Sequence, residues 1–327
     1  MKLFRRIIKW IGKFLGMVIV LIILAGLIFR LFMHTEAPEG ELINIGKFKL
    51  HINSSGEKSN KPTVVIEGGA GLSTEFYHWL NQGLKDSLRV VRYDRAGLGY
   101  SDACVTPRDP ETIARELHTL LEKSGESPPY IMMGHSLGGP YIRVFTELYP
   151  DEVVAMFFLD ATHHDHIERY NAPKASSFRF KGFMAFTGLQ ATVADMGILS
   201  LFDRLVGTPY YGEGLPDEIN SRIKGLLNNG KSFRGYKQEM KHYYATLKRS
   251  AQTDDFGSLP IRSFTAIREH SENESPEEDK KYREFEDLST NGKHFGIVGN
   301  HVTIFSKKEN ANVICKEVLR VVNTLKD

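Results

Sequence analysis

Residues 130–140 read YIMMGHSLGGP, and this stretch decides how the chain is expected to fold. It opens with a short apolar run typical of a buried strand, and it leads into a segment from 140 to 149 with the apolar spacing of a helix. Gly134, Ser136 and Gly138 lie between the two. Glycines there keep Cβ atoms out of a crowded strand-to-helix turn. The stretch therefore predicts a strand, a tight turn with a serine at its tip, and a helix.

Short apolar strands alternate with helices on both sides of this turn. Such alternation predicts a mostly parallel sheet with helices on both faces, an α/β fold. The expected helices, besides 140–149, are 112–123 and a closing helix from about 309 to 325. A hairpin-like pair is expected within KFKLHINSSGEKSNK (47–61). The expected strands are TVVIE (63–67), LRVVRYD (88–94), YIMMG (130–134), EVVAMFFLD (152–160), LPIRSFTAI (259–267) and KHFGIVG (293–299).

Residues 163–256 break this alternation. Two stretches there, KGFMAFTGLQATVADMGILSLFDRL (181–205) and FRGYKQEMKHYYATLKRS (233–250), have helical spacing with no strand between them. We therefore predict a helical cap at 163–256 that is inserted into a core formed by residues 35–162 and 257–327.

The N-terminal segment, residues 1–34, predicts one transmembrane helix. Phe14 to Phe29 carries no charge, and about 20 helical residues cross a hydrocarbon core of about 30 Å. A cleaved signal peptide is the closest alternative, but its apolar region usually has about 7–15 residues and ends in small residues. The segment here is longer and closes with IFRLFMHTE (28–36), which favours a retained anchor.

The basic residues around this segment predict its orientation. Only Arg30 lies at the far end, whereas five basic residues precede the span: Lys2, Arg5, Arg6, Lys9 and Lys13. The positive-inside rule places such a flank in the cytoplasm. We expect a single-pass protein of the cell membrane whose remaining chain is extracytoplasmic.

Overall composition excludes some classes of partner. The 327 residues carry a net charge of +2, with no basic block outside the N-terminus, so no nucleic-acid binding is expected. Cys104 and Cys315 are the two cysteines and form no C-x-x-C motif, so we interpret them as packed thiols. The oligomeric state stays open.

The chain resembles the α/β-hydrolase family over about residues 45–327. GHSLGG (134–139) matches the family's nucleophile turn, in which a serine is exposed above the sheet and the following amide faces a developing oxyanion. VVRYDRAGLGYSD (90–102) matches a loop after an early strand, and VVIEGGAG (64–71) stands where the family has its oxyanion loop. The resemblance implies a serine hydrolase with Ser136 as nucleophile.

The resemblance also implies the two amides that would hold the oxyanion. One is that of Leu137, directly after the serine. The other is that of Ala70, because many members end this strand in His-Gly-x and x donates its amide. Gly68 stands here in place of that histidine, so the glycines leave a shift of one residue open.

The family order is nucleophile, acid, histidine. His301 follows the last predicted strand, within HFGIVGNHVTIF, and catalytic groups of open α/β sheets gather at the carboxyl ends of strands. His294 begins that strand and so would lie at the opposite edge of the sheet. His301 is therefore the predicted catalytic histidine.

Two positions compete for the acid. Many members place it after the strand that follows the cap, where this chain offers only Glu269 and Glu272. Other members place it after the strand that follows the nucleophile helix, and here that position is Asp160. A strand-end aspartate that only caps a turn is the plainer interpretation of Asp160. We predict Asp160 as the acid, with Glu269 as the alternative.

The run THHDH after Asp160 raises the question of a metal site. Side chains of adjacent residues in an extended chain point apart, so they reach a single ion only with ligands from elsewhere. A serine triad needs no metal and no cofactor, and none is expected. We interpret His163, His164 and His166 as the polar entrance to the cap. Asp94 and Arg95 are expected to pin their glycine-rich loop by hydrogen bonds to backbone.

These features predict a membrane-anchored serine hydrolase, carboxylesterase- or lipase-like, that acts on a small-molecule ester or amide through an acyl-enzyme. An aminopeptidase-like or amide hydrolase is the first alternative, although such relatives carry His-Gly-Gly-Pro-Gly and a Trp where this chain has EGGAG and GHSLGG. Dehalogenase and epoxide-hydrolase relatives use an aspartate nucleophile, in contrast to Ser136. A non-catalytic binding protein on the same fold is the alternative from another class.

Overall fold

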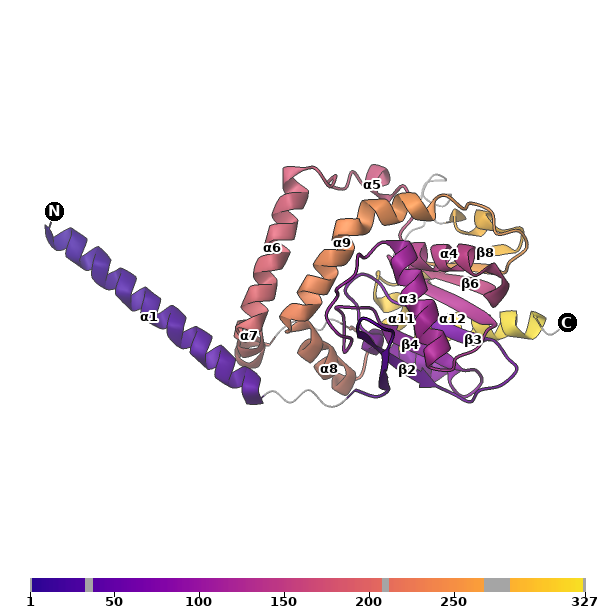
Figure 1. The fold of residues 1–327 in the computed structure, drawn as a ribbon, viewed down its shortest axis with the longest axis horizontal. Helices are drawn as coiled ribbons and strands as arrows, with labels where there is room; N and C mark the ends of the chain where they lie inside the picture. The colour runs from indigo at the N-terminus through magenta and orange to yellow at the C-terminus, as the bar shows by residue number, and fades with distance from the viewer. Residues whose placement is uncertain (1, 33–37, 208–211, 268–282, 326–327) are drawn as a thin grey trace.

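The computed structural model describes residues 2–32, 38–207, 212–267 and 283–325. Within them, eight strands form one sheet in the order β1-β2-β4-β3-β5-β6-β7-β8 (Figure 1). The strands are β1 (Glu41–Asn44), β2 (Lys49–Ser55), β3 (Thr63–Glu67), β4 (Val90–Asp94), β5 (Tyr130–His135), β6 (Val153–Leu159), β7 (Ile261–Ile267) and β8 (Gly292–Val298).

The sheet is mostly parallel, as the sequence predicts. Strands β3 to β8 run parallel to one another, whereas β1 and β2 form an antiparallel edge beside β4. The prediction of a hairpin within residues 47–61 is wrong. Lys49–Ser55 is a single strand, and it forms a hairpin with the earlier segment Glu41–Asn44. The segment after Ser55 turns instead toward the buried strand β3.

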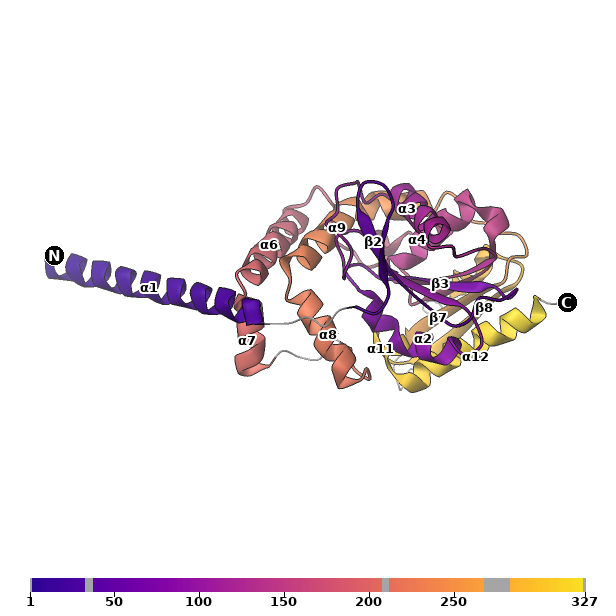
Figure 2. The ribbon, with the colours of Figure 1, turned by 60° about the horizontal axis from the view of Figure 1, so that its bottom comes forward.

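Helices cover both faces of the sheet, and each face has its own apolar core. The helices α3 and α4 pack on one face, and α2, α11 and α12 pack on the other (Figure 2). Because both faces are covered, the central strands are apolar and buried on both sides, which the continuous apolar run of β6 shows. The bounds of these helices are α2 (His78–Leu84), α3 (Pro110–Lys123), α4 (Gly138–Leu148), α11 (Thr303–Ser306) and α12 (Lys308–Thr324).

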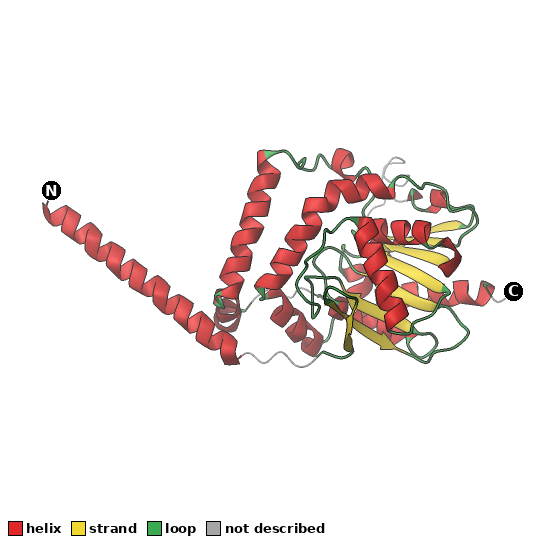
Figure 3. Ribbon diagram, viewed as in Figure 1, coloured by secondary structure: helices red, strands yellow, loops and turns green. Residues whose placement is uncertain are grey.

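The segment between β6 and β7 is helical and stands apart from the sheet (Figure 3). Two long helices of this cap, α6 and α9, pack against each other, and α9 also packs on α4. The cap therefore lies over the helix that follows the serine turn. Its helices are α5 (His166–Arg169), α6 (Phe178–Asp195), α7 (Ile198–Val206), α8 (Asp217–Leu227) and α9 (Gly230–Ser250).

Helix α1 (Lys2–Phe32) extends away from the rest of the molecule (Figure 1). It has 31 residues, which corresponds to about 46 Å at 1.5 Å per residue. Its stretch Leu3–Arg30 is long and apolar enough to cross a membrane. Most of its large apolar side chains are exposed, as expected for a surface that faces lipid.

Candidate active site

The serine turn lies between β5 and α4. Ser136 has a φ of +52°, a left-handed conformation that non-glycine residues rarely adopt. A Cβ built on Gly134 would lie 2.6 Å from the carbonyl oxygen of Gly138, and one on Gly138 would collide with the carbonyl oxygen of Glu67. The two glycines are therefore required by close backbone contacts, and the strained turn holds Ser136 at the carboxyl edge of the sheet.

Among the described residues, the backbone amides of Ala70 and Leu137 near Ser136 are available as donors, whereas those of Gly69 and Gly71 are already used. Gly69 donates its amide to Tyr77 Oη at 2.8 Å, and Gly71 donates to Glu239 Oε2 at 3.1 Å. Among the described residues, the Ala70 amide between them has no acceptor, and neither has the amide of Leu137. Of residues 69–71, Ala70 alone thus presents an unused N–H, at the position suggested by the sequence.

The loop that carries Ala70 lies directly beside the serine turn. A Cβ built on Gly69 would be 3.2 Å from Ser136 Cβ and 2.7 Å from His135 Nδ1. A larger residue at position 69 would therefore push the loop away from the serine. An oxyanion held by amides on both sides of Ser136 is geometrically reasonable here.

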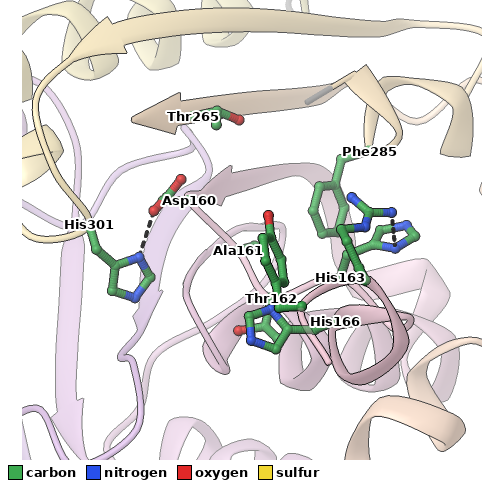
Figure 4. Close-up of a pocket in the computed structure, with 10 residues that line it drawn as sticks. Asp160, Ala161, Thr162, His163, His166, Thr265, Phe285 and His301 are labelled. Carbon is green, nitrogen blue, oxygen red and sulfur yellow. Dashed lines mark hydrogen bonds and ion pairs between the residues drawn. The ribbon is translucent and has the colours of Figure 1, made fainter. Parts of the chain in front are cut away.

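His301 and Asp160 are hydrogen-bonded to each other (Figure 4). His301 Nδ1 lies 2.6 Å from Asp160 Oδ2, and the other carboxylate oxygen, Oδ1, accepts the amide of Ala266 at 3.1 Å. The predicted rival His294 contacts Thr265 Oγ1 instead, at 3.2 Å. Glu269, the alternative acid, lies outside the described residues.

The strand end of β6 fixes this carboxylate relative to the serine turn. Asp160 has a φ of +42°, and its amide donates to the carbonyl of Phe264 at 2.7 Å. The neighbouring Thr162 amide donates to the carbonyl of Ser136 at 2.9 Å. Among the described residues, Ser136 Oγ has no hydrogen-bond partner, and such contacts commonly tighten only with substrate bound.

His135 belongs to the turn motif, and the sequence carries no further signal of a role for it. Its Nε2 lies 3.0 Å from the carbonyl oxygen of His301, and its Nδ1 lies 3.1 Å from Tyr77 Oη. Because a carbonyl can only accept, Nε2 carries the proton, and Nδ1 accepts from the Tyr77 hydroxyl. Since Tyr77 also accepts the amide of Gly69, a chain of hydrogen bonds joins the loop of Ala70 to the loop of His301.

Burial sets the charge of this histidine. His135 is almost inaccessible to solvent. Burial, together with the nearby ring of His301, lowers the pKa of His135 well below its ordinary value of 6.5. The ring is therefore neutral at neutral pH, as the hydrogen-bond pattern requires.

Arg95 supports the oxyanion loop more directly than expected. Its guanidinium donates to the carbonyls of Gly68 and Gly69 at 2.6 and 2.8 Å. It also forms buried ion pairs with Glu67 of β3 and Glu239 of the cap helix α9, at 2.5 and 2.6 Å. Arg95 thus forms hydrogen bonds to backbone, but it holds the loop after β3 rather than its own glycine-rich loop, and it also connects the loop after β3 to the cap.

Asp94 also holds backbone in place, in the segments around Thr74 and Tyr100. Its carboxylate accepts the amides of Thr74 and Tyr100 at 2.8 and 3.0 Å, and it pairs with His51 at 2.8 Å. These contacts are buried in the interior of the protein, so Asp94 holds the backbone in place and does not contact substrate.

A polar cavity of about 160 Å³ adjoins His301 and Asp160. Arg169 also lines the cavity, and His163 and His166 lie across it from His301 (Figure 4). Two of the three histidines of the THHDH run, His163 and His166, thus line the space next to His301 and Asp160, whereas His164 is exposed and does not line it.

The same run takes part in a cluster with metal-like spacing. Ligand atoms of His163, Asp165 and Glu284 lie within 4.8 Å of one another. Arg169 Nη2, however, lies 2.7 Å from Asp165 and 2.5 Å from Glu284. The guanidinium already supplies a cation to both carboxylates, so the cluster is explained as an ion-pair network.

A second cavity, of about 290 Å³, opens beside Ala70 and is mostly apolar. Leu72 and Phe76 from the core and Phe233 and Tyr236 from α9 form its walls. An apolar space of this kind is suited to the hydrocarbon part of a ligand.

Comparisons with known proteins agree with this architecture. A family profile described as the alpha/beta hydrolase fold matches residues 61–199. The chain is 26% identical over 196 residues to the uncharacterized protein YbdG of Bacillus subtilis, a match covering 58% of the chain and 60% of YbdG. It is 29% identical over 194 residues to an AB hydrolase superfamily protein of Gibberella zeae, covering 56% and 59%. The chain thus spans about 60% of the length of these relatives.

Among solved structures, a thermophilic esterase from Thermogutta terrifontis superposes with a TM-score of 0.59. The sequences are 17% identical, and the match covers 88% of this chain and 99% of the esterase chain. At this identity the likeness concerns the fold.

Proposed function

We propose that this chain, which has the α/β-hydrolase fold, is a membrane-anchored serine hydrolase that cleaves carboxylic esters. The observation that carries the proposal is one constellation at one edge of the sheet. It comprises a strained serine, two amides beside it that have no acceptor within the described part of the chain, and a histidine hydrogen-bonded to a carboxylate.

The geometry supports the following mechanism. His301, oriented through Nδ1 by Asp160, accepts the proton of Ser136 as its Oγ attacks the ester carbonyl. The amides of Ala70 and Leu137 donate to the oxyanion. His301 then returns the proton to the departing alcohol, which leaves an acyl group on Ser136. A water activated by His301 hydrolyses this acyl-enzyme and releases the acid.

An ester is preferred over an amide or an epoxide for specific reasons. Opening an epoxide by the aspartate-nucleophile route needs a carboxylate where this chain has Ser136. Cleavage of an amide requires protonation of a poor leaving group. The sequence also lacks two features of aminopeptidase-like relatives, the His-Gly-Gly-Pro-Gly oxyanion loop and the tryptophan within the nucleophile turn. Amide hydrolysis remains the second candidate, favoured by the polar groups around the small cavity beside His301.

We place the anchor at α1. The basic residues before the span favour a cytoplasmic N-terminus and a catalytic body on the other side of the cell membrane. Protease added to intact cells is expected to digest the body, and its complete protection would contradict this orientation.

The function is tested by active-site labelling and turnover. Purified full-length protein is treated with a fluorophosphonate probe and assayed on a soluble short-chain aryl ester. Wild type is expected to label and turn over, Ser136→Ala to do neither, and Ser59→Ala, at an exposed loop serine, to match wild type. Absence of both labelling and turnover in the wild type would overturn the proposal.

The acid is tested by a paired substitution. Asp160→Asn is expected to lower kcat by about 10³–10⁴-fold, as in other serine triads whose acid is neutralised. Asp165→Asn, which removes a carboxylate that contacts His163 and Arg169, is the matched control and is expected to have a small effect. A large loss in Glu269→Gln with near-normal Asp160→Asn would reassign the acid.

A further inference from the structure

The cap helices α6 and α7 expose large apolar side chains to solvent. Leu205 is 75% exposed and Phe186 is 57% exposed, although side chains of this size are normally buried. Besides Asp195 near its end, α6 contains no acidic residue. We call the exposed side chains the α6–α7 face: Phe178, Phe186, Leu189, Phe202, Leu205 and Val206. Several exposed large apolar side chains on two consecutive helices indicate an interaction site.

The α6–α7 face is continuous with the helix that is apolar enough to cross a membrane. α7 packs against α1, and the contact is closest where Gly26 of α1 meets Gly197 at the start of α7. A Cβ on Gly26 would lie 2.6 Å from the carbonyl oxygen of Met196. Arg30 Nη1 donates to the carbonyl of Asp195 at 2.6 Å. Figures 1 and 2 both show α6 and α7 on the side of the body from which α1 leaves.

The position of this contact along α1 fixes its depth. Gly26 precedes Arg30, the charge at the end of the apolar span, by one helical turn, or about 6 Å. The α6–α7 junction is therefore level with the boundary between hydrocarbon and headgroups. The two helices meet at a bend of 77°, so they cannot both follow α1 across the bilayer.

We propose that the α6–α7 face lies on the bilayer that α1 enters, with its apolar side chains in the boundary between headgroups and hydrocarbon. Amphipathic or apolar helices held in this way bury side chains about 5–10 Å deep. Arg179 and Lys181, near the start of α6, supply positive charge suited to lipid phosphates.

A cavity is lined by other residues of α6, the helix that carries half of this face. Its volume is about 400 Å³, and it lies between α6 and α9. Phe183 lines it and is itself 39% exposed on α6. His166 lines both this cavity and the small polar cavity that adjoins His301. The two cavities thus meet at His166, which places the space between α6 and α9 next to the candidate site.

The substrate class follows from this cavity, and this step rests on the proposed ester hydrolysis. The cavity walls contain Phe180, Phe183, Met240 and Tyr243, which fit a hydrocarbon chain better than a polar group. We therefore assign as substrate a bilayer lipid ester with a long acyl chain, taken up from the membrane at Phe183 rather than from solution.

Docking is tested on the full chain in lipid nanodiscs. In a Cys104→Ser background, Phe186→Cys and Leu205→Cys are labelled with an environment-sensitive fluorophore. Val105→Cys serves as the control, at a 66% exposed apolar position in the loop between β4 and α3. Lipids that carry a nitroxide near the headgroup are expected to quench the first two labels strongly and the third weakly. Equal quenching of all three labels, or quenching of none, would overturn docking on the bilayer and would indicate that the α6–α7 face binds a protein partner.

The substrate class is tested by hydrolysis in the same nanodiscs. Leu205→Glu combined with Phe186→Glu is expected to lower hydrolysis of a long-chain bilayer ester at least about tenfold, the factor for losing one buried large apolar side chain. Turnover of a soluble short-chain ester should be unchanged, and Val105→Glu should alter neither activity. A wild type that cleaves the soluble ester but no bilayer ester would overturn this inference alone, whereas no turnover of either would overturn the proposed function.

Discussion

At the scale of single residues, His135 connects groups that the proposed reaction needs together. One ring nitrogen donates to the carbonyl of His301, and the other accepts from Tyr77, which in turn holds the amide of Gly69. The neutral ring satisfies both contacts, whereas a protonated ring would face the Tyr77 hydroxyl with a second N–H. The network therefore depends on His135 staying uncharged.

This dependence predicts a pH effect on stability. Below about pH 6.5 the unfolded chain binds a proton at His135 that the folded chain excludes, because burial lowers the folded pKa. The free energy of unfolding should then fall as the pH falls, by up to about 1.4 kcal/mol per pH unit for this group. Denaturant unfolding in detergent between pH 5 and about 7.5 measures the slope.

His135→Gln separates this contribution from those of other histidines. Glutamine can still donate to one partner and accept from the other, but it does not titrate. The slope should become shallower in His135→Gln and stay unchanged in His164→Gln, at an exposed position. An identical slope in all three proteins would show that His135 is not the group responsible.

The candidate site residues differ in how far sequence could identify them. Ser136 was identifiable because the strand, the glycine-rich turn and the helix that present it are contiguous in the sequence. Asp160 and His301 required knowing which strand ends meet, and the family order supplied this. His135 could not be assigned a role, because its partners Tyr77 and His301 are distant in the chain and are brought together only by the folded sheet.

At the scale of elements, Arg95 couples the loop after β3 to helix α9. It donates to Gly68 and Gly69 of that loop and pairs with Glu239. Because these charges are buried, each requires its partner. The cap is therefore attached to the oxyanion loop by an ion pair as well as by apolar packing.

This attachment predicts the effect of Glu239→Gln. The substitution weakens a charged hydrogen bond and should lower the free energy of unfolding by about 1.5–3 kcal/mol. It also weakens the hydrogen bond that holds the Gly71 amide next to Ala70, so kcat should fall by up to about 10²-fold. Glu218→Gln, in an exposed pair with Arg222, should change stability by less than about 1 kcal/mol. Equal effects of the two substitutions in unfolding and kinetic assays would contradict the coupling.

Elements whose apolar residues recur with a strong helical or strand period were predictable from sequence. Elements whose position depends on the segment they pair with were less predictable. The strands β3 to β8 and the helices α3 and α4 are continuous apolar or amphipathic runs, and the sequence predicts them. The hairpin at the sheet edge was misplaced because Glu41–Asn44 is short and mostly exposed, so its pairing with Lys49–Ser55 leaves little apolar signal. The arrangement of cap helices depends on contacts that periodicity does not encode.

At the scale of the whole molecule, the close approach of α1 and α7 orients the body on its anchor. Gly26 and Gly197 allow the two backbones to touch. The span itself was evident from sequence, since it is a long uncharged run, but its contact with the cap was not. A GxxxG at Gly12 and Gly16 was the visible small-residue motif, and a Cβ on either would meet nothing within 4 Å.

Gly26→Val should therefore release the cap from the anchor. The added side chain would collide with the backbone of Met196, so amide hydrogen exchange in residues 196–206 should rise in nanodiscs. Gly16→Val, on the same helix with open space around it, is the matched control and should leave exchange unchanged. Unaltered exchange in Gly26→Val would mean that α7 does not rest on α1 in the bilayer.

The short connection between α1 and β1 has a kinetic consequence. Only residues 33–40 separate Phe32 from Glu41, and a chain of this length reaches at most about 30 Å. With the proposed anchor and docking, the rest of the protein stays close to the membrane and meets the proposed lipid esters by lateral diffusion in two dimensions. Its velocity should follow the mole fraction of substrate in the bilayer, so diluting that substrate with inert lipid would slow turnover even when the total amount in the sample is constant.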